Sequence, residues 1–216
     1  MKTFSHIISW VFLPLLTPVY GLLLALYVPS MPEVLYFRES LYFMSPEAKQ
    51  ALLLMFVTFS ALAPGISFLF LHKQKVITTI DMEDKTERSI PMFLMLAYCL
   101  LLFGIFFYKF PEGQLPKYVY ALPLAGVFVT VSYTLINNWI KISLHGGGAG
   151  ILTGFLLAYS IDQLIFPFWV IIVAVIASGL TLSARLYLHK HTPREVYTGW
   201  SLAVLITFMI THFYPM

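Results

Sequence analysis

Residues 168–214 read FWVIIVAVIASGLTLSARLYLHKHTPREVYTGWSLAVLITFMITHFY, which is two apolar runs joined by the short polar turn LHKHTPRE at 188–195. Each run has about 20 residues, long enough to cross a hydrocarbon core of about 30 Å as a helix. In lipid, the backbone has to satisfy its hydrogen bonds within each segment. The pattern therefore predicts two transmembrane helices that meet at one face of a membrane.

The same pattern extends along the whole chain. Of the 216 residues, 59% are hydrophobic and only 11% are charged, whereas a soluble domain carries roughly 25% charged residues. We predict an all-α bundle of transmembrane helices that forms a single integral membrane domain over residues 1–216. Its predicted spans are about 7–29, 49–72, 91–109, 118–140, 146–162, 165–188 and 196–214. The first run is too long for a signal-peptide core and has no small-x-small cleavage site after it, which favours a retained helix.

Three polar segments are each separated by two predicted spans, so they must emerge on one face. They are residues 72–91, the turn KISLH at 141–145, and the turn at 188–195. This face carries nine lysines and arginines: Lys2, Lys73, Lys75, Lys85, Arg88, Lys141, Arg185, Lys190 and Arg194. The opposite face carries four: Arg38, Lys49, Lys109 and Lys117. The positive-inside rule by itself places the first face in the cytoplasm.

The shared face also gathers ionisable residues in regular spacings. Arg185 and His191 form R-x5-H, His191 and Glu195 form H-x3-E, and Ser143 and His145 form S-x-H. Ionisable groups at membrane depth indicate a functional site. Thr192 to Glu195 also spell T-P-x-E, a capping box with proline at the first helical position, which is an alternative reason for Glu195.

These motifs resemble those of the type 2 phosphatidic acid phosphatase superfamily, which carries K-x6-R-P, P-S-G-H and S-R-x5-H-x3-D on one face of a six-helix core. ARLYLHKHTPRE (184–195) matches the third motif, ISLH (142–145) the second, and DMEDKTERSIP (81–91), more loosely, the first. The resemblance implies a six-helix phosphatase-like core with about one extra helix near the N-terminus. Asp81 stands at the position of the family's first lysine, and Glu195 replaces its aspartate.

The resemblance implies a metal-independent membrane phosphatase that hydrolyses a lipid phosphate or an isoprenoid diphosphate through a phosphohistidine intermediate, with no cofactor. The residues are suited to that chemistry. A neutral His191 attacks phosphorus while Glu195 holds its other ring nitrogen. His145 protonates the leaving alcohol and then activates water. We therefore expect His191, His145 and Glu195 to be the catalytic residues.

The transition state of phosphoryl transfer is stabilised mainly by positioning and by positive charge. Arg185 and Arg88 are expected to bind the phosphate oxygens, because a planar guanidinium matches phosphate geometry. Ser143 is expected to add a donor, together with the backbone N–H groups at the start of the span at 146–162. Lys141, beside the S-x-H turn, is a substitute for the missing phosphate-binding lysine.

Two arguments on membrane orientation conflict. The lysine and arginine count favours a cytoplasmic site, whereas the resemblance to bacterial family members implies the outer side of the bacterial inner (plasma) membrane. If Arg88, Arg185 and Lys141 bind phosphate, six basic residues remain against four, which is nearly no bias. We therefore favour the outer side.

Two other functions stay open. A non-catalytic relative would bind a lipid headgroup or a partner on the same basic face. An intramembrane prenyltransferase-like enzyme would use Asp81 and Asp84, three residues apart, as a magnesium-diphosphate site. In each case we expect the protein to be embedded in the lipid bilayer. The net charge of +3 does not suggest a nucleic-acid partner. The sequence leaves the oligomeric state open. Gly146, Gly150 and Gly154 lie four residues apart, a spacing that favours close helix contact for the latter two.

Overall fold

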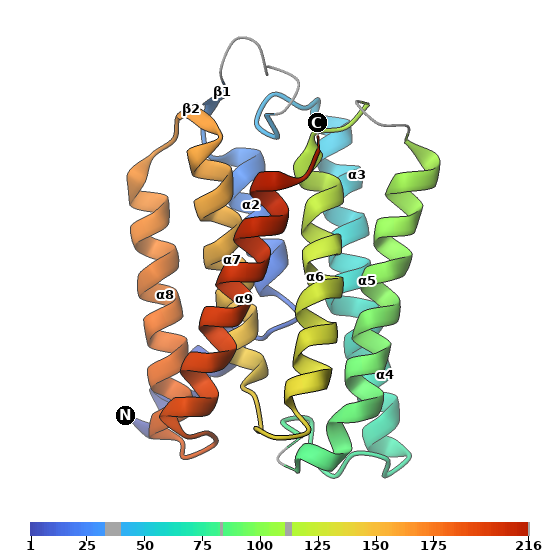
Figure 1. Cartoon of the computed structure of the whole chain (residues 1–216), viewed down its shortest axis with the longest axis vertical. Helices are drawn as coiled ribbons and strands as arrows, with labels where there is room; N and C mark the ends of the chain where they lie inside the picture. The colour runs from blue at the N-terminus through green and yellow to red at the C-terminus, as the bar shows by residue number, and fades with distance from the viewer. Residues whose placement is uncertain (33–39, 83, 111–113, 216) are drawn as a thin grey trace.

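A computed structural model describes residues 1–32, 40–82, 84–110 and 114–215, and most of them are helical. The helices run side by side along the long axis of the molecule (Figure 1). Six helical segments in this part of the chain are long and apolar enough to cross a membrane. The predicted all-α bundle of a multi-pass membrane protein is confirmed.

The six segments match six of the predicted spans to within a few residues. They are α3 (Pro46–Phe56) continued by the π-helical η2 (Val57–Leu62) and α4 (Ala63–Lys73), the short η3 (Lys85–Arg88) continued by α5 (Ser89–Lys109), α6 (Lys117–Ile136), α7 (Leu144–Ile161), α8 (Phe168–Tyr187) and α9 (Pro193–Phe213). Their ends follow local chemistry. The predicted capping box at the start of α9 is present, with Thr192 and Glu195 each accepting from the other's backbone N–H.

The prediction of one continuous helix over 7–29 is wrong. The chain forms two helices here, α1 (Lys2–Val11) and α2 (Thr17–Tyr27), separated by a non-helical link at 12–16. Pro14 is the physical reason, because a proline inside a helix removes a backbone donor and clashes with the carbonyl four residues earlier. Pro18 lies in the first turn of α2, where its missing donor costs nothing. α1 packs against α8, and α2 packs against α7.

A small antiparallel pair of strands, absent from the sequence prediction, lies at the end of the bundle where the chain terminates (Figure 1). β1 (Met31–Pro32) pairs with β2 (Gln163–Ile165), with Met31 opposite Ile165. Because each strand follows a helix, the pair ties the end of α2 to the end of α7.

Helix α7 is the centre of the bundle, with α2, α6, α8 and α9 packed around it. Its contact with α9 depends on glycine. A Cβ atom added at Gly150 would lie 2.6 Å from the carbonyl oxygen of Trp200, and one at Gly154 would lie 2.6 Å from that of Val204. Such distances leave no room for a side chain, so the close helix contact predicted from the glycine spacing is confirmed.

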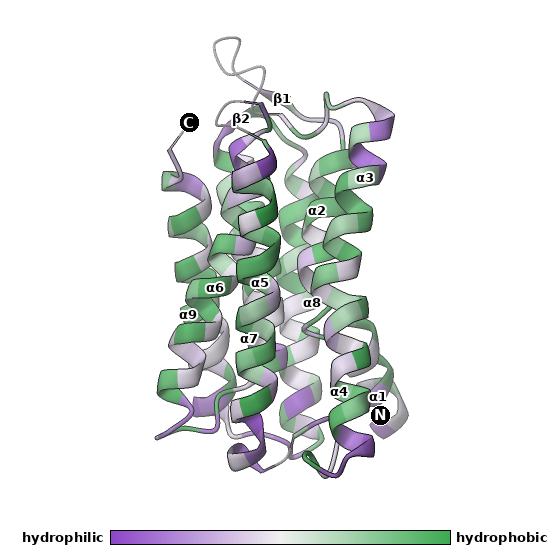
Figure 2. Ribbon diagram, turned by 90° about the vertical axis from the view of Figure 1, so that its right-hand side faces the viewer, coloured by the Kyte–Doolittle hydropathy of each residue, from purple (hydrophilic) through white to green (hydrophobic). Residues whose placement is uncertain are grey.

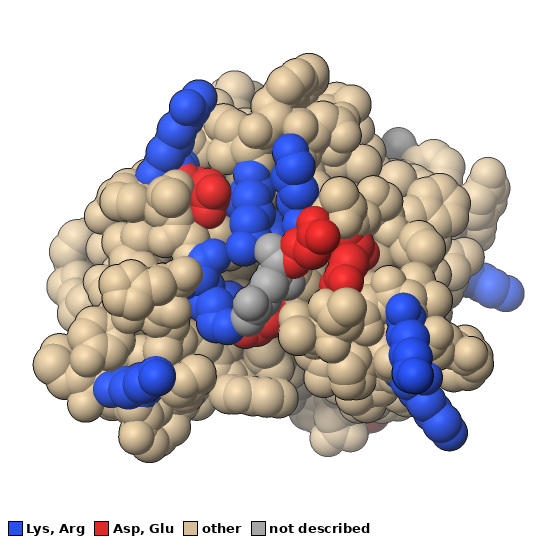
Figure 3. All heavy atoms as spheres, turned by 90° about the horizontal axis from the view of Figure 1, so that it is seen from below, with Lys and Arg blue, Asp and Glu red and all other residues tan. Residues whose placement is uncertain are grey.

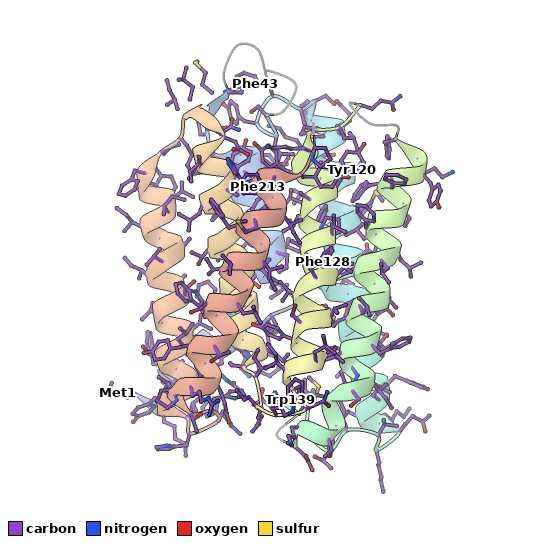
Figure 4. The ribbon with its side chains drawn as sticks, viewed as in Figure 1. Met1, Phe43, Tyr120, Phe128, Trp139 and Phe213 are labelled. Carbon is purple, nitrogen blue, oxygen red and sulfur yellow. The ribbon has the colours of Figure 1, made fainter. Side chains whose placement is uncertain are left out.

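Hydrophobic residues cover the length of the bundle, and hydrophilic residues concentrate at its two ends (Figure 2). Aromatic side chains lie near both ends: Trp139 at one end, and Tyr120 and Phe213 toward the other (Figure 4). Trp139 is 77% exposed. Amphipathic rings favour the headgroup level of a membrane, so this distribution fits a bundle that spans the bilayer from end to end.

Asp162 organises a polar network at the end opposite the predicted site. Its carboxylate lies 3.0 Å from Lys117 Nζ and 2.7 Å from His212 Nδ1, and it accepts a hydrogen bond of 3.1 Å from the Tyr118 hydroxyl. The four residues come from α6, from the end of α7 and from α9. A partly buried charge is stable only when it is paired, so this network holds three helix ends together.

Candidate functional site

The three polar segments that the crossing count assigned to one face do meet at one end of the bundle. They are the link from α4 to η3, the link from α6 to α7, and the turn from α8 to α9 (Figure 1). Lysine, arginine and acidic side chains gather around the middle of this end, and further basic side chains lie at its rim (Figure 3). The spatial grouping of the motifs therefore agrees with the sequence prediction.

A cavity of about 150 Å³ opens between these segments. Its polar residues include Asp81, Arg88, His145, Arg185 and His191, which come from five separate elements or links. Four of the predicted catalytic or phosphate-binding residues, His145, His191, Arg88 and Arg185, thus line the same cavity. A cavity of this volume accommodates a small organic group.

The remainder of the cavity wall is largely apolar. It is formed by the link between α1 and α2 together with α4, α5, α6 and α7, and includes Leu13, Pro14, Leu15, Phe68, Met92, Met95, Val129 and Ile151. One region of the cavity therefore suits a charged group and the other suits a hydrocarbon chain. The proline break that the sequence prediction missed contributes directly to this wall.

His191 lies in the turn between α8 and α9, with its side chain only 3% exposed. Its Nδ1 is 2.9 Å from Glu195 Oε2, and the same carboxylate oxygen accepts a hydrogen bond of 3.1 Å from the Thr192 backbone N–H. Glu195 thus caps α9 and orients His191 at the same time. Because a carboxylate only accepts, Nδ1 carries the proton, and the lone pair of the neutral ring lies on Nε2.

The surroundings keep the His191 ring neutral at physiological pH. Burial lowers the pKa of His191 to about 4 from its ordinary value. The hydrogen bond to Glu195 opposes that shift, while the positive charges of Arg88, Arg185 and Lys141 reinforce it. A neutral imidazole with an oriented ring is the form that acts as a nucleophile.

His145 occupies the first turn of α7 and is buried. Its Nε2 lies 3.2 Å from the backbone oxygen of Ser9 in α1. A carbonyl oxygen only accepts, so Nε2 is the donor and Nδ1 is the nitrogen left for proton exchange. The N-terminal helix, which lies outside the residues that carry the family resemblance, therefore fixes the orientation of a predicted catalytic residue.

Arg88 and Arg185 both line the cavity, but their guanidinium groups contact different partners. Arg88, 1% exposed, donates from Nε to the backbone oxygen of Met82 at 2.9 Å and from Nη1 to that of Ile142 at 2.6 Å. These bonds hold its guanidinium rigidly at the cavity wall. Arg185, at the end of α8, is 3% exposed, and its Nη2 lies 3.7 Å from Asp81 Oδ1. The cavity thus contains two fixed positive charges.

Two predicted phosphate ligands occupy other positions. Ser143 is fully buried, and its hydroxyl caps α7 by accepting from the Gly146 backbone N–H at 3.2 Å. Lys141 donates from Nζ to the backbone oxygen of Lys190 at 3.3 Å. Neither residue lines the cavity. A serine immediately before a helix is a strong capping residue, and that local role places its hydroxyl on the helix end instead of in the cavity.

From the sequence, Asp81 has a predicted functional role only in the prenyltransferase alternative. The prenyltransferase alternative paired it with Asp84, but Asp84 caps η3 by accepting from the Thr86 backbone N–H at 2.9 Å and does not line the cavity. Asp81 lines the cavity beside Arg185. Its place in the first motif, where the family has a lysine, was the signal that this position belongs to the site.

No protein-family model, curated protein or solved structure matches the chain.

Proposed function

We propose that this protein is a metal-independent phosphatase that hydrolyses the phosphate ester of a membrane lipid through a phosphohistidine intermediate. The observation that carries the proposal is the His191–Glu195 pair, with Nδ1 and Oε2 2.9 Å apart, in a cavity that also contains Arg88 and Arg185. The pair leaves Nε2 as the nucleophile, and the arginines supply the positive charge that a transferring phosphoryl group requires.

The first step forms the phosphohistidine. His191 Nε2 attacks phosphorus, and the bond from phosphorus to the lipid oxygen breaks. The Glu195 carboxylate stabilises the positive charge that develops on the ring. Neutral His145 accepts at Nδ1 the proton of the singly protonated phosphate ester and passes it to the leaving lipid alkoxide. The Ser9 carbonyl accepts from Nε2 of His145 in both protonation states, so the ring orientation is unchanged by the transfer.

The second step restores the enzyme. Neutral His145 takes a proton from water, and the hydroxide attacks phosphorus as the bond to His191 breaks. The departing phosphate takes the proton back from His145, so both histidines are again neutral. The apolar cavity wall provides a place for the hydrocarbon chain next to the phosphate, which favours a lipid substrate over a soluble one.

A second candidate is a protein that binds a lipid phosphate without hydrolysing it. The 3.7 Å contact between Asp81 and Arg185 favours it, because a carboxylate beside a phosphate-binding cation weakens the positive charge available to a transition state. Both candidates use the same cavity and lipid class, and they differ only in turnover.

The purified protein should release inorganic phosphate from lipid phosphate monoesters or prenyl diphosphates in detergent micelles, and a chelator should leave the rate unchanged. The reason is that arginine and histidine supply the charge stabilisation and the proton transfer in the proposed mechanism. Phosphate release in the presence and absence of EDTA checks this expectation. Binding without any release would favour the second candidate, and loss of activity with EDTA would contradict the mechanism.

We further propose, from the family resemblance, that the site faces the outer side of a bacterial inner membrane. Arg194→Cys, exposed beside the site, and Lys109→Cys, exposed at the opposite end, form a matched pair in a Cys99→Ala background. A membrane-impermeant thiol reagent applied to cells with an intact inner membrane should label the first and spare the second. The reverse labelling would place the site in the cytoplasm.

A further inference from the structure

Asp81 lies at the edge of the cavity, and hydrogen bonds anchor the backbone on both sides of it. On one side of it, Glu87 Oε2 accepts hydrogen bonds from the Thr78 backbone N–H at 2.9 Å and from the Thr78 hydroxyl at 3.1 Å. On the other side, the Met82 backbone oxygen accepts from Arg88 Nε at 2.9 Å, and the Met82 side chain is only 4% exposed. The backbone on both sides of Asp81 is therefore anchored, which keeps its carboxylate at the edge of the cavity.

The Asp81 carboxylate lies beside a cation that the proposed mechanism needs. One oxygen is 3.7 Å from Arg185 Nη2, the other is 4.0 Å from Lys190 Nζ, and the side chain is 39% exposed. A phosphate that contacts Arg185 would lie within roughly 6 Å of this carboxylate, a range over which two like charges repel appreciably at the partly buried edge of a protein.

The net charge of the cavity is small. Among the residues that the structure describes, the charged side chains lining it are Arg88, Arg185 and Asp81, and burial together with the two arginines favours a neutral His191. Two positive charges and one negative charge leave a net charge of about +1. That charge matches a phosphate group bearing one negative charge better than one bearing two.

We propose that Asp81 is a specificity-determining residue that makes this cavity favour a singly charged phosphate group over a phosphate dianion. Phosphodiesters and protonated phosphomonoesters are the two lipid sources of such a group, and the second negative charge of a dianion would be repelled by the fixed carboxylate. The inference rests on the proposed function, since it concerns the headgroup that the same cavity accepts.

Two short-chain lipids that differ in headgroup charge test the proposal. At pH 8, dihexanoyl phosphatidic acid is mostly a dianion, because the second pKa of a phosphomonoester is about 6, whereas dihexanoyl phosphatidylmethanol is a monoanion. Their dissociation constants are measured by calorimetry in detergent for the unmodified protein and for Asp81→Asn. Asp84→Asn is the matched control: it removes the same charge three residues away, from a side chain outside the cavity, and asparagine retains the cap on η3.

The unmodified protein should bind phosphatidylmethanol more tightly than phosphatidic acid. Asp81→Asn should strengthen phosphatidic acid binding about tenfold and phosphatidylmethanol binding about threefold at most, since the carboxylate repels two charges in one case and one in the other. Asp84→Asn should change neither constant more than about twofold. Equal changes for both lipids would assign Asp81 a structural role and overturn the proposal, as would tighter binding of phosphatidic acid by the unmodified protein.

A measurement on the unmodified protein keeps the test independent of any variant. Lowering the pH from 8.5 to 5.5 protonates phosphatidic acid but not phosphatidylmethanol, so the ratio of their dissociation constants should move toward unity. The charged and titratable groups that face the site are Asp81, Arg88, Lys141, His145, Arg185, Lys190, His191 and Glu195. At the lower pH both lipids bear about one negative charge, so the charges of the site act on both alike there. An unchanged ratio would overturn the proposal.

The calorimetric result is separate from the outcome for catalysis. Charge-selective binding without phosphate release would support the role of Asp81 and would leave the cavity as a binding site instead of an enzyme. Phosphate release together with equal dissociation constants for the two lipids would support the enzymatic function and overturn the role of Asp81. Failure of both lipids to bind the unmodified protein would overturn both proposals.

Discussion

Replacing His191 with alanine should reduce phosphate release from a lipid phosphate by roughly 10⁴-fold or more, to the level of the detergent blank. Among the described residues of the cavity, His191 combines a side chain 3% exposed with a carboxylate on its Nδ1. Without its ring, no phosphohistidine forms, and the arginines alone supply only binding and charge. Steady-state assays of phosphate release on purified protein measure the effect.

His189→Asn is the matched control for that substitution. His189 is exposed in the same turn and has a φ of 54°, a left-handed conformation that asparagine tolerates. It should retain most of the activity. The His191→Ala protein should still bind phosphatidylmethanol, because Arg88 and Arg185 remain, which separates lost chemistry from lost folding. Undiminished phosphate release by the His191→Ala protein would refute the phosphohistidine mechanism.

Hydrophobic run length predicted most of the fold, because a bilayer imposes a simple requirement on every segment that crosses it. The exception was the run at 7–29, where apolar composition concealed a break at 12–16. Pro14 was visible in the sequence, and its missing donor would have predicted the break had it been weighed against hydropathy. The short pairing of Met31 with Ile165 was beyond prediction, since neither segment has the length or alternation of a strand.

The sequence was informative about the site where function depends on local spacing. His191 and Glu195 are four residues apart across a helix start, so their contact follows from the geometry of a capping box. It was less informative where side chains compete for several partners. Ser143 and Lys141 are close in sequence to His145, which lines the cavity. Their polar atoms nevertheless bond elsewhere: the Ser143 hydroxyl accepts from the Gly146 backbone N–H, and the Lys141 ammonium donates to the Lys190 backbone oxygen.

Long-range contacts account for the remaining differences. The contact of His145 with the Ser9 carbonyl joins residues 136 positions apart, and nothing in either local pattern predicts it. The same holds for Asp81 in the link between α4 and η3, whose partner Arg185 lies in the last turn of α8. Spacing rules describe one helix or turn at a time, so contacts that depend on how helices pack are visible only in the folded chain.

Replacing Glu195 with glutamine should slow phosphate release by about 10² to 10⁴-fold while leaving the protein folded. Glutamine at this position still completes the capping box at the start of α9, so the helix end is preserved. What is lost is the negative charge that holds the proton on Nδ1 of His191 and stabilises the phosphorylated ring. The rate is measured from pH 4 to pH 8 for both proteins.

The pH profile separates this electrostatic role from capping. His191 is active when neutral, and its lowered pKa puts the acid limb of kcat/KM below the ordinary histidine value of about 6.5, toward 4. The hydrogen bond to Glu195 raises that pKa, so Glu195→Gln should move the limb to still lower pH, whereas a loss of capping alone would leave it in place.

Thr192→Ala removes the other half of the capping box and keeps the contact between Glu195 and His191. It should cost about 1 kcal/mol of stability and leave both the rate and the limb nearly unchanged. If Thr192→Ala slowed the enzyme as much as Glu195→Gln did, Glu195 would act through the helix end and not through the ring of His191.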